Sequence, residues 1–143
     1  MIDRSLGAVD PQDALEIQQV VAHCSHLLDS HQWDSLHEVF TEDVVFDATD
    51  LRGPVVRGLD NLRAHFDSRD HPVAHHTTDL LIFTESGATS ARLHCKYFLP
   101  RDDGTVASGD YFDTAIKTPA GWRIAARRCT LRRQHSLPDT SRR

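Results

Sequence analysis

Histidine is the side chain in this sequence with the most capacity for chemistry. The 143 residues include ten histidines; His71, His75 and His76 lie close together, and His23 and His26 are three positions apart. Imidazole changes charge near neutral pH, so it can act as a general acid or base or as a metal ligand. A zinc site needs three or four converging ligands, and the chain has no H-E-x-x-H or C-x-x-C motif. We therefore expect acid–base chemistry, with no metal and no organic cofactor.

The sequence offers little for two other kinds of site. Its cysteines, Cys24, Cys95 and Cys129, are odd in number, far apart and without a basic neighbour in a recognisable motif. This pattern favours free thiols in a reducing cytoplasm over disulfides or a catalytic nucleophile. The seven glycines are scattered among turns, so no glycine-rich phosphate-binding loop is expected.

Charge and hydropathy exclude several classes of partner. The net charge is −5 with histidine neutral, which argues against a general nucleic-acid binder. No apolar run reaches the length of a membrane span, and the N-terminus lacks the apolar segment of a secretory signal. One basic cluster near the C-terminus is interpreted as a solvated strand end and tail; it comprises Arg127, Arg128, Arg132, Arg133, Arg142 and Arg143.

The first half of the chain has helical patterns. Asp10 followed by Pro11 is typical of a helix start, with a capping carboxylate and a proline at the first helical position. This helix is predicted to run to about Asp29, with an apolar stripe formed by Ile17, Val20, Val21, Cys24, Leu27 and Leu28. Ser30 opens a second, short helix that buries Trp33, Leu36, Val39 and Phe40. A third helix is predicted at about 59–68.

The second half has the pattern of a sheet. A short strand at 44–46 and an edge strand within 51–58, where Pro54 is tolerable, precede it. Long strands are predicted at about 73–84, 89–100, 105–118 and 121–133, joined by turns at 86–87, 102–104 and 119–121. Helices followed by a meander of antiparallel strands indicate an α+β fold, with a curved sheet wrapped around the first helix.

The order of these segments resembles a known family. The resemblance lies in LLDSHQWDSLHEVFTEDVVFD, GLDNLRAHF, HHTTDLLI and SGDYFDTAIKTPAGWRIAARR. Together they resemble the SnoaL-like branch of the nuclear transport factor two-like superfamily, which includes scytalone dehydratase, bile-acid dehydratases, ketosteroid isomerase and polyketide cyclases. The resemblance covers one domain, about residues 10–133, and leaves 1–9 and 134–143 as flexible tails.

This resemblance implies a fold, a ligand and a class of function. The fold is a cone-shaped barrel: a strongly bent, mixed or antiparallel sheet around a long N-terminal helix, with two shorter helices. A deep pocket would hold a small hydrophobic, oxygenated ring compound, which a cofactor-independent lyase (dehydratase) or isomerase would convert. The alternative is a non-catalytic binding or structural partner module, because the fold also occurs in the small subunit of ring-hydroxylating dioxygenases. A homodimer through the sheet face is the expected assembly.

The resemblance also selects a catalytic pair. Asp29 takes the place of an aspartate at the end of the first helix, although helical spacing puts it off the apolar stripe, where a capping role is the alternative. The family histidine lies four residues before the position of Asp79, which selects His75 over His76. Adjacent strand residues point to opposite faces, so only one of the two can reach the pocket.

A carboxylate paired with a histidine suits proton transfer. Asp29 would fix one ring nitrogen of His75 and leave the other as a base, stabilising the imidazolium once it forms. Such a pair can take a proton next to a carbonyl and then protonate a departing hydroxyl. These two steps make up the elimination of water or a double-bond shift.

The remaining predicted site residues also follow from the resemblance. Arg127 and Tyr111 occupy pocket positions, where they could contact a ligand carboxylate or a developing oxyanion, and Tyr97 could line the cavity. Cys24 stands where several relatives have tyrosine or lysine, and Ala48 where the fungal scytalone dehydratase has a tyrosine. The chain thus lacks that enzyme's pair of tyrosines, and scytalone itself is not the expected substrate.

Overall fold

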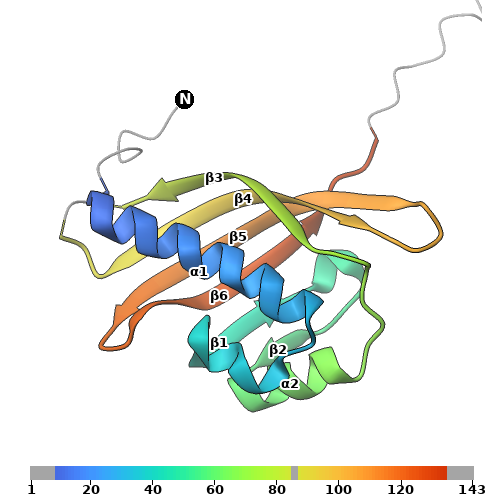
Figure 1. Ribbon diagram of the computed structural model, residues 1–143, viewed down its shortest axis with the longest axis horizontal. Coiled ribbons are helices and arrows are strands. Elements are labelled where there is room, and N and C mark those ends of the chain that lie inside the picture. The colour runs from blue at the N-terminus through green and yellow to red at the C-terminus, as the bar shows by residue number, and fades with distance from the viewer. Residues whose placement is uncertain (1–8, 85–86, 135–143) are drawn as a thin grey trace, which may run out of the picture.

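The computed structural model describes residues 9–84 and 87–134, so the predicted tails 1–9 and 134–143 lie outside this part of the chain except for residues 9 and 134. The described chain forms an open mixed sheet whose one face is covered by a long helix, α1 (Figure 1). The helices are α1 (Pro11–Asp29), the 3-10 helices η1 (Trp33–Glu38) and η2 (Thr49–Leu51), and α2 (Leu59–Asp67). The strands are β1 (Phe40–Asp47), β2 (Val55–Arg57), β3 (His76–Phe83), β4 (Ser90–Pro100), β5 (Val106–Thr118) and β6 (Gly121–Leu131).

Helix α1 begins and ends as the sequence predicts. The Asp10 carboxylate accepts a hydrogen bond from the Gln12 amide at 3.0 Å, and Pro11 is the first helical residue. Its buried side consists of Asp13, Ile17, Val21, Cys24, Leu27 and Leu28. Among the described residues, no helix is both long enough and apolar enough to span a membrane.

The sheet order is β2-β1-β6-β5-β4-β3, so β2 and β3 are its edges. All neighbouring strands are antiparallel except β1 and β6, which pair in parallel. This arrangement confirms the predicted α+β fold with a cone-like sheet and also the predicted edge strand after Pro54. The sheet does not close into a complete barrel.

Two element boundaries at the junction of the second helix and the first strand differ from the prediction. The second helix is only the short η1, and β1 starts at Phe40, earlier than residue 44. The parallel pairing explains both, because the Val39 carbonyl accepts a hydrogen bond from the Ile124 amide and Phe40 pairs with Ile124. The residues that would have continued the helix are therefore hydrogen-bonded in the sheet instead.

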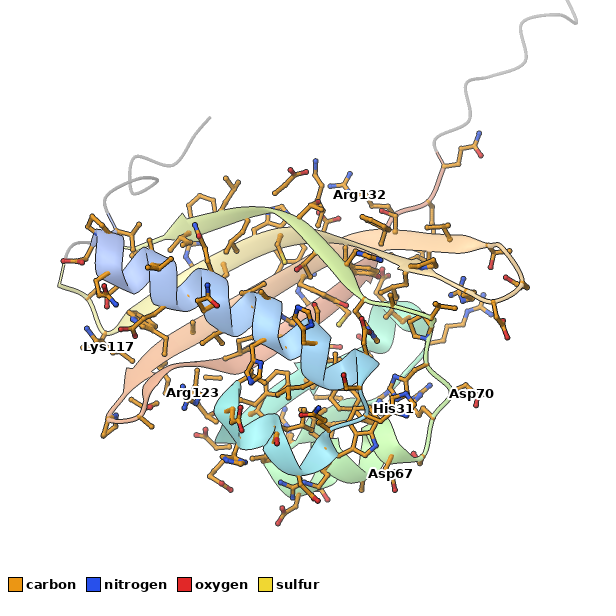
Figure 2. The ribbon with its side chains drawn as sticks, in the orientation of Figure 1. His31, Asp67, Asp70, Lys117, Arg123 and Arg132 are labelled. Carbon is orange, nitrogen blue, oxygen red and sulfur yellow. The ribbon has the colours of Figure 1, made fainter. Side chains whose placement is uncertain are left out.

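A buried carboxylate ties α1 to the sheet. The Asp13 side chain accepts hydrogen bonds from the Trp122 indole and from the Lys117 ammonium, each at 2.9 Å. Trp122 is 1% exposed, so its N–H would be unsatisfied without this partner. The hydrogen bond from Trp122, followed by that from Lys117, lowers the pKa of Asp13. Lys117 lies at the end of the sheet near the start of α1 (Figure 2).

The side of the sheet facing α1 requires a glycine on β5. The Tyr97 ring lies over Gly109, and its hydroxyl donates to the Thr130 carbonyl at 2.8 Å. A Cβ atom at Gly109 would lie 1.9 Å from the Thr130 oxygen and 2.4 Å from the Tyr97 ring. Neither the backbone oxygen nor the buried ring has room to move, so only glycine fits here.

We predict that Gly109→Ala lowers the free energy of unfolding by at least about 2 kcal/mol, because the methyl group clashes with backbone and a packed ring. Chemical denaturation measures the loss. The neighbouring Ser108→Ala, which removes one hydrogen bond to the Tyr97 carbonyl, should cost less than about 1 kcal/mol. Equal stabilities of the wild type and Gly109→Ala would contradict this account.

Candidate functional site

The structure brings Asp29 and His75 together, although they are far apart in the sequence. Asp29 is the last residue of α1, and His75 immediately precedes β3. The His75 Nδ1–H and its backbone N–H both donate to Asp29 Oδ1, at 2.7 and 2.8 Å. Since the carboxylate only accepts, Nδ1 carries the proton, and Nε2 is the basic nitrogen of the neutral ring.

Aromatic rings surround this dyad on the side of the helix ends. The His71 Nε2–H donates to the Phe66 carbonyl at 2.7 Å, and the His71 ring lies 6.1 Å from the His75 ring. Trp33 lies 5.1 Å from His71 and stacks on His31 at the same centroid distance. These contacts hold the segment between α2 and β3 and thereby fix where His75 lies.

Burial decides the charge of His75. Its side chain is 10% exposed, and removal from water lowers the pKa of His75, although Asp29 partly offsets this effect. His71 and Arg127 lower the pKa further through their charges. The neutral imidazole is therefore favoured, which is the form that a general base requires.

His76 points away from the dyad. It is exposed and stacks on Phe98 at 4.6 Å, on the face of the sheet opposite α1, which we call the outer face. Strand alternation thus places the two neighbouring histidines on different sides. Of this pair, His75 is the one that contacts Asp29.

Arg127 reaches the core but is already paired. Its Nε and Nη2 donate to the two carboxylate oxygens of Asp113 at 2.9 and 2.8 Å, and its Nη1 lies 3.6 Å from the Cys24 sulfur. The Arg127 and Asp113 side chains are 3% and 1% exposed. The charge predicted to meet a ligand carboxylate is thus neutralised by a partner that the sequence analysis did not identify. Because the two residues are directly opposite in the β5–β6 register, their opposite charges were the available signal.

Tyr111 lies between two flat groups. The Arg127 guanidinium lies over its ring at 4.1 Å, and the Tyr97 ring stacks on it at 4.4 Å. Burial raises the pKa of Tyr111 well above its ordinary value and that of Tyr97 to about 12. Both phenols are therefore neutral hydrogen-bond donors at physiological pH, and Tyr97 already donates to Thr130.

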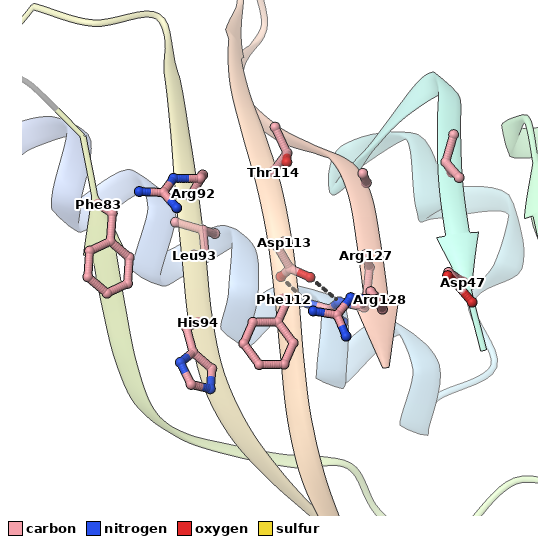
Figure 3. Close-up of a pocket in the computed structure, with 12 residues that line it drawn as sticks. Asp47, Phe83, Arg92, Leu93, His94, Phe112, Asp113, Thr114, Arg127 and Arg128 are labelled. Carbon is pink, nitrogen blue, oxygen red and sulfur yellow. Dashed lines mark hydrogen bonds and ion pairs between the residues drawn. The ribbon is translucent and has the colours of Figure 1, made fainter. Parts of the chain in front are cut away.

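Asp29 and His75 line neither of two cavities that lie close to these residues. One of about 720 Å³ adjoins the dyad through His71 and is lined mainly by polar groups, including Arg69 and Arg101. Its lining also includes His31 and Asp70, which are labelled in Figure 2. The other, of about 540 Å³, lies on the outer face (Figure 3). The cavity beside the dyad is more polar than the apolar pocket expected from the sequence.

The described residues give no support to metal or thiol chemistry. Within 9–84 and 87–134, no group of three or more histidine, cysteine or acidic residues is placed to hold a metal ion. All three cysteines are free and buried, and burial raises the pKa of Cys95 to about 11 and that of Cys129 to about 12. Protonated, buried thiols are poor nucleophiles.

Comparisons with known proteins identify the family of the chain. The family profile of the SnoaL-like domain matches residues 11–128. The uncharacterized protein Rv2910c of Mycobacterium tuberculosis is 30% identical, over 89% of this chain and 91% of its own length.

Solved structures show the same fold. A variant of Rv3472 from Mycobacterium tuberculosis, of unknown function, has a TM-score of 0.73 at 29% identity, covering 87% of this chain and 78% of that one. A candidate scytalone dehydratase of Novosphingobium aromaticivorans has a TM-score of 0.71 at 17% identity, covering 88% and 90%. At that identity the second likeness concerns the fold alone.

We predict that Asp29→Asn lowers the pKa of His75 further, because it removes the carboxylate charge that raises this pKa. An NMR titration of the histidine ring protons measures the change. Asp102→Asn, an exposed carboxylate on the β4–β5 turn, is the control and should leave the His75 titration unchanged. An unchanged or higher His75 pKa in Asp29→Asn would contradict the dyad.

Proposed function

The chain belongs to the SnoaL-like family, and from this we propose that it is a cofactor-independent dehydratase or isomerase of a small oxygenated ring compound. The observation that carries the proposal is the Asp29–His75 pair, with both His75 donors on one carboxylate oxygen and Nε2 left as the base. This arrangement holds a neutral imidazole in one tautomer and one orientation.

The proposed reaction is an elimination in two proton transfers. His75 Nε2 takes a proton from the carbon next to a carbonyl, and the electrons of that C–H bond form an enolate. When the enolate collapses, a C=C bond forms, the C–O bond to the β-hydroxyl breaks, and the imidazolium returns its proton to the departing oxygen. Water is the only by-product, so no oxidant or metal is required. In the isomerase variant the proton returns to another carbon.

Asp29 supports this cycle through charge. When His75 takes the proton, the imidazolium lies 2.7 Å from a carboxylate, which stabilises it in surroundings where His75 is largely shielded from water. The Tyr111 hydroxyl and the N–H groups of Arg127 that do not bind Asp113 are the proposed donors to the enolate oxygen. Cys24 and Tyr97 are proposed to line the same space.

A second candidate function is a non-catalytic binding module of the same fold. It is favoured by one observation: neither of the two cavities described above is lined by Asp29 or His75. In this case the Asp29–His75 pair only holds the end of α1 against the start of β3. The two functions differ in whether substitution of His75 abolishes turnover.

We predict that the wild type converts 3-hydroxy-1-tetralone, a ring ketone with a β-hydroxyl group, to 1-naphthol, and that His75→Ala lowers the rate by about 10²- to 10⁴-fold. The rate should fall as the pH drops through the lowered pKa of His75, because only the neutral ring accepts a proton. Ultraviolet absorbance and mass spectrometry follow the product.

The matched control is His76→Ala, since His76 is adjacent in sequence but exposed on the outer face. Its rate should stay within about twofold of the wild type. Equal rates for His75→Ala and the wild type, or no turnover of any β-hydroxy ring ketone by the wild type, would favour the binding module.

A homodimer through the sheet remains part of the proposal. On the outer face, Phe98 is 40% exposed and Val106 is 60% exposed, and both lie toward the β4–β5 turn. Two large apolar groups on a sheet face without a covering helix are suited to burial against a second copy. Phe98→Glu should convert the dimer to a monomer in light scattering, whereas Leu15→Glu on α1 should not. A wild-type monomer would contradict the proposal.

A cytoplasmic location is also proposed. Cys24, Cys95 and Cys129 are free and buried, as is usual for a protein kept in a reducing compartment.

A further inference from the structure

The charge balance of the proposed site depends on three side chains. Arg127 is the only buried lysine or arginine in the described part of the chain. Burial lowers the pKa of His75, and the charge of Arg127 lowers it further, so this guanidinium acts electrostatically on the dyad. Two carboxylates, those of Asp29 and Asp113, belong to the same site. With His75 neutral, the site therefore has one more negative charge than it has positive charges.

Asp113 neutralises Arg127 without using all of its hydrogen-bond donors. The two Asp113 oxygens accept from Arg127 Nε at 2.9 Å and from Nη2 at 2.8 Å (Figure 3). Nη1 lies 3.6 Å from the Cys24 sulfur. A guanidinium has five N–H bonds. Three of them are directed at Asp113 and Cys24, which leaves two, one on Nη1 and one on Nη2, without an acceptor among the described residues.

Tyr111 adds a donor that carries no charge. The Arg127 guanidinium lies over its ring at 4.1 Å, and burial raises the pKa of Tyr111 well above its ordinary value, so the hydroxyl keeps its proton. The neighbouring Tyr97 hydroxyl already donates to the Thr130 carbonyl at 2.8 Å. The site thus offers N–H and O–H donors without an excess of positive charge. Such donors suit a carbonyl oxygen, whereas a buried carboxylate also needs a countercharge.

The proposed reaction keeps the charge of this site constant. When His75 takes a proton from an uncharged ketone, the enolate and the imidazolium form together, and their charges cancel. A ligand with a carboxylate group brings a negative charge before any proton moves. It would meet the carboxylates of Asp29 and Asp113 in surroundings poor in water, where like charges repel strongly and the lost hydration is not replaced.

We infer that the ligand of this site is an uncharged ring compound with a carbonyl group, and that Asp113 is the residue that excludes ring carboxylates. The inference rests on the proposed function, because it places the ligand beside His75 and Arg127. Without the charge of Asp113, the Arg127 guanidinium would be free to pair with a ligand carboxylate. Specificity thus comes from a charge that disfavours the wrong ligand.

The test compares 2-acetonaphthone with 2-naphthoate, which have the same ring and differ in a methyl group in place of a charged oxygen. Calorimetry on the full chain measures both affinities, and NMR shifts of His75 and Arg127 show where each probe binds. We expect the wild type to bind the ketone at least about tenfold more tightly than the carboxylate. Asp113→Asn should bind naphthoate at least about tenfold more tightly than the wild type does.

Two further variants separate charge from damage to the fold. Asp110→Asn is the matched control, because Asp110 is also a buried carboxylate paired with an arginine, Arg132, but lies on the outer face. It should leave the preference for the ketone unchanged. The double variant Arg127→Gln/Asp113→Asn removes both charges and should gain no affinity for naphthoate. The comparison of the two probes on the wild type tests the inference even if Asp113→Asn does not fold.

The outcomes separate this inference from the proposed reaction. Wild type that binds naphthoate as tightly as acetonaphthone, or Asp113→Asn that folds and gains no naphthoate affinity, would overturn the inference and leave the reaction untouched. The expected preference without turnover of 3-hydroxy-1-tetralone would support the inference and contradict the reaction. Shifts from both probes that avoid His75 and Arg127 would overturn the inference, because the ligand would then lie elsewhere.

Discussion

The arginine in the core is the constraint on which much of the surrounding structure depends. A guanidinium that is 3% exposed has lost its hydration, and the unpaired charge would be strongly destabilising. Asp113 neutralises it through two hydrogen bonds, the Cys24 sulfur lies beside Nη1, and the Tyr111 ring covers its face. Tyr97 stacks on Tyr111, and this in turn requires a glycine at position 109.

This buried polar cluster also influences the dyad. Burial is the largest cause of the lowered pKa of His75, and the charge of Arg127 adds to it. A ligand in contact with Arg127 would have to share it with Asp113.

Each face of the sheet carries a histidine whose ring is held by a carboxylate, and the surroundings of the two rings differ. On the α1 side, Asp29 orients His75, whose side chain is only 10% exposed; on the outer face, Asp110 orients His94, which is 31% exposed. In both pairs the carboxylate binds one ring nitrogen. The difference lies in the neighbours, because His75 is enclosed by other rings and His94 borders an open groove between arginines.

The sequence alone determined the local elements and the family. Asp10 and Pro11 predicted the start of α1, the alternating segments predicted the hairpins, and the order of motifs predicted an α+β, cone-like fold, because these signals act between residues close in the chain. Helical spacing by itself put Asp29 off the apolar stripe, and only the family resemblance paired it with His75.

The remaining features depend on tertiary structure. The parallel pairing of β1 with β6 shortened the second helix, and the β5–β6 register placed Arg127 opposite Asp113. The tertiary structure also placed His94 beside Asp110. These outcomes depend on which distant strands meet and in which register, and a pattern of neighbouring residues does not encode that choice.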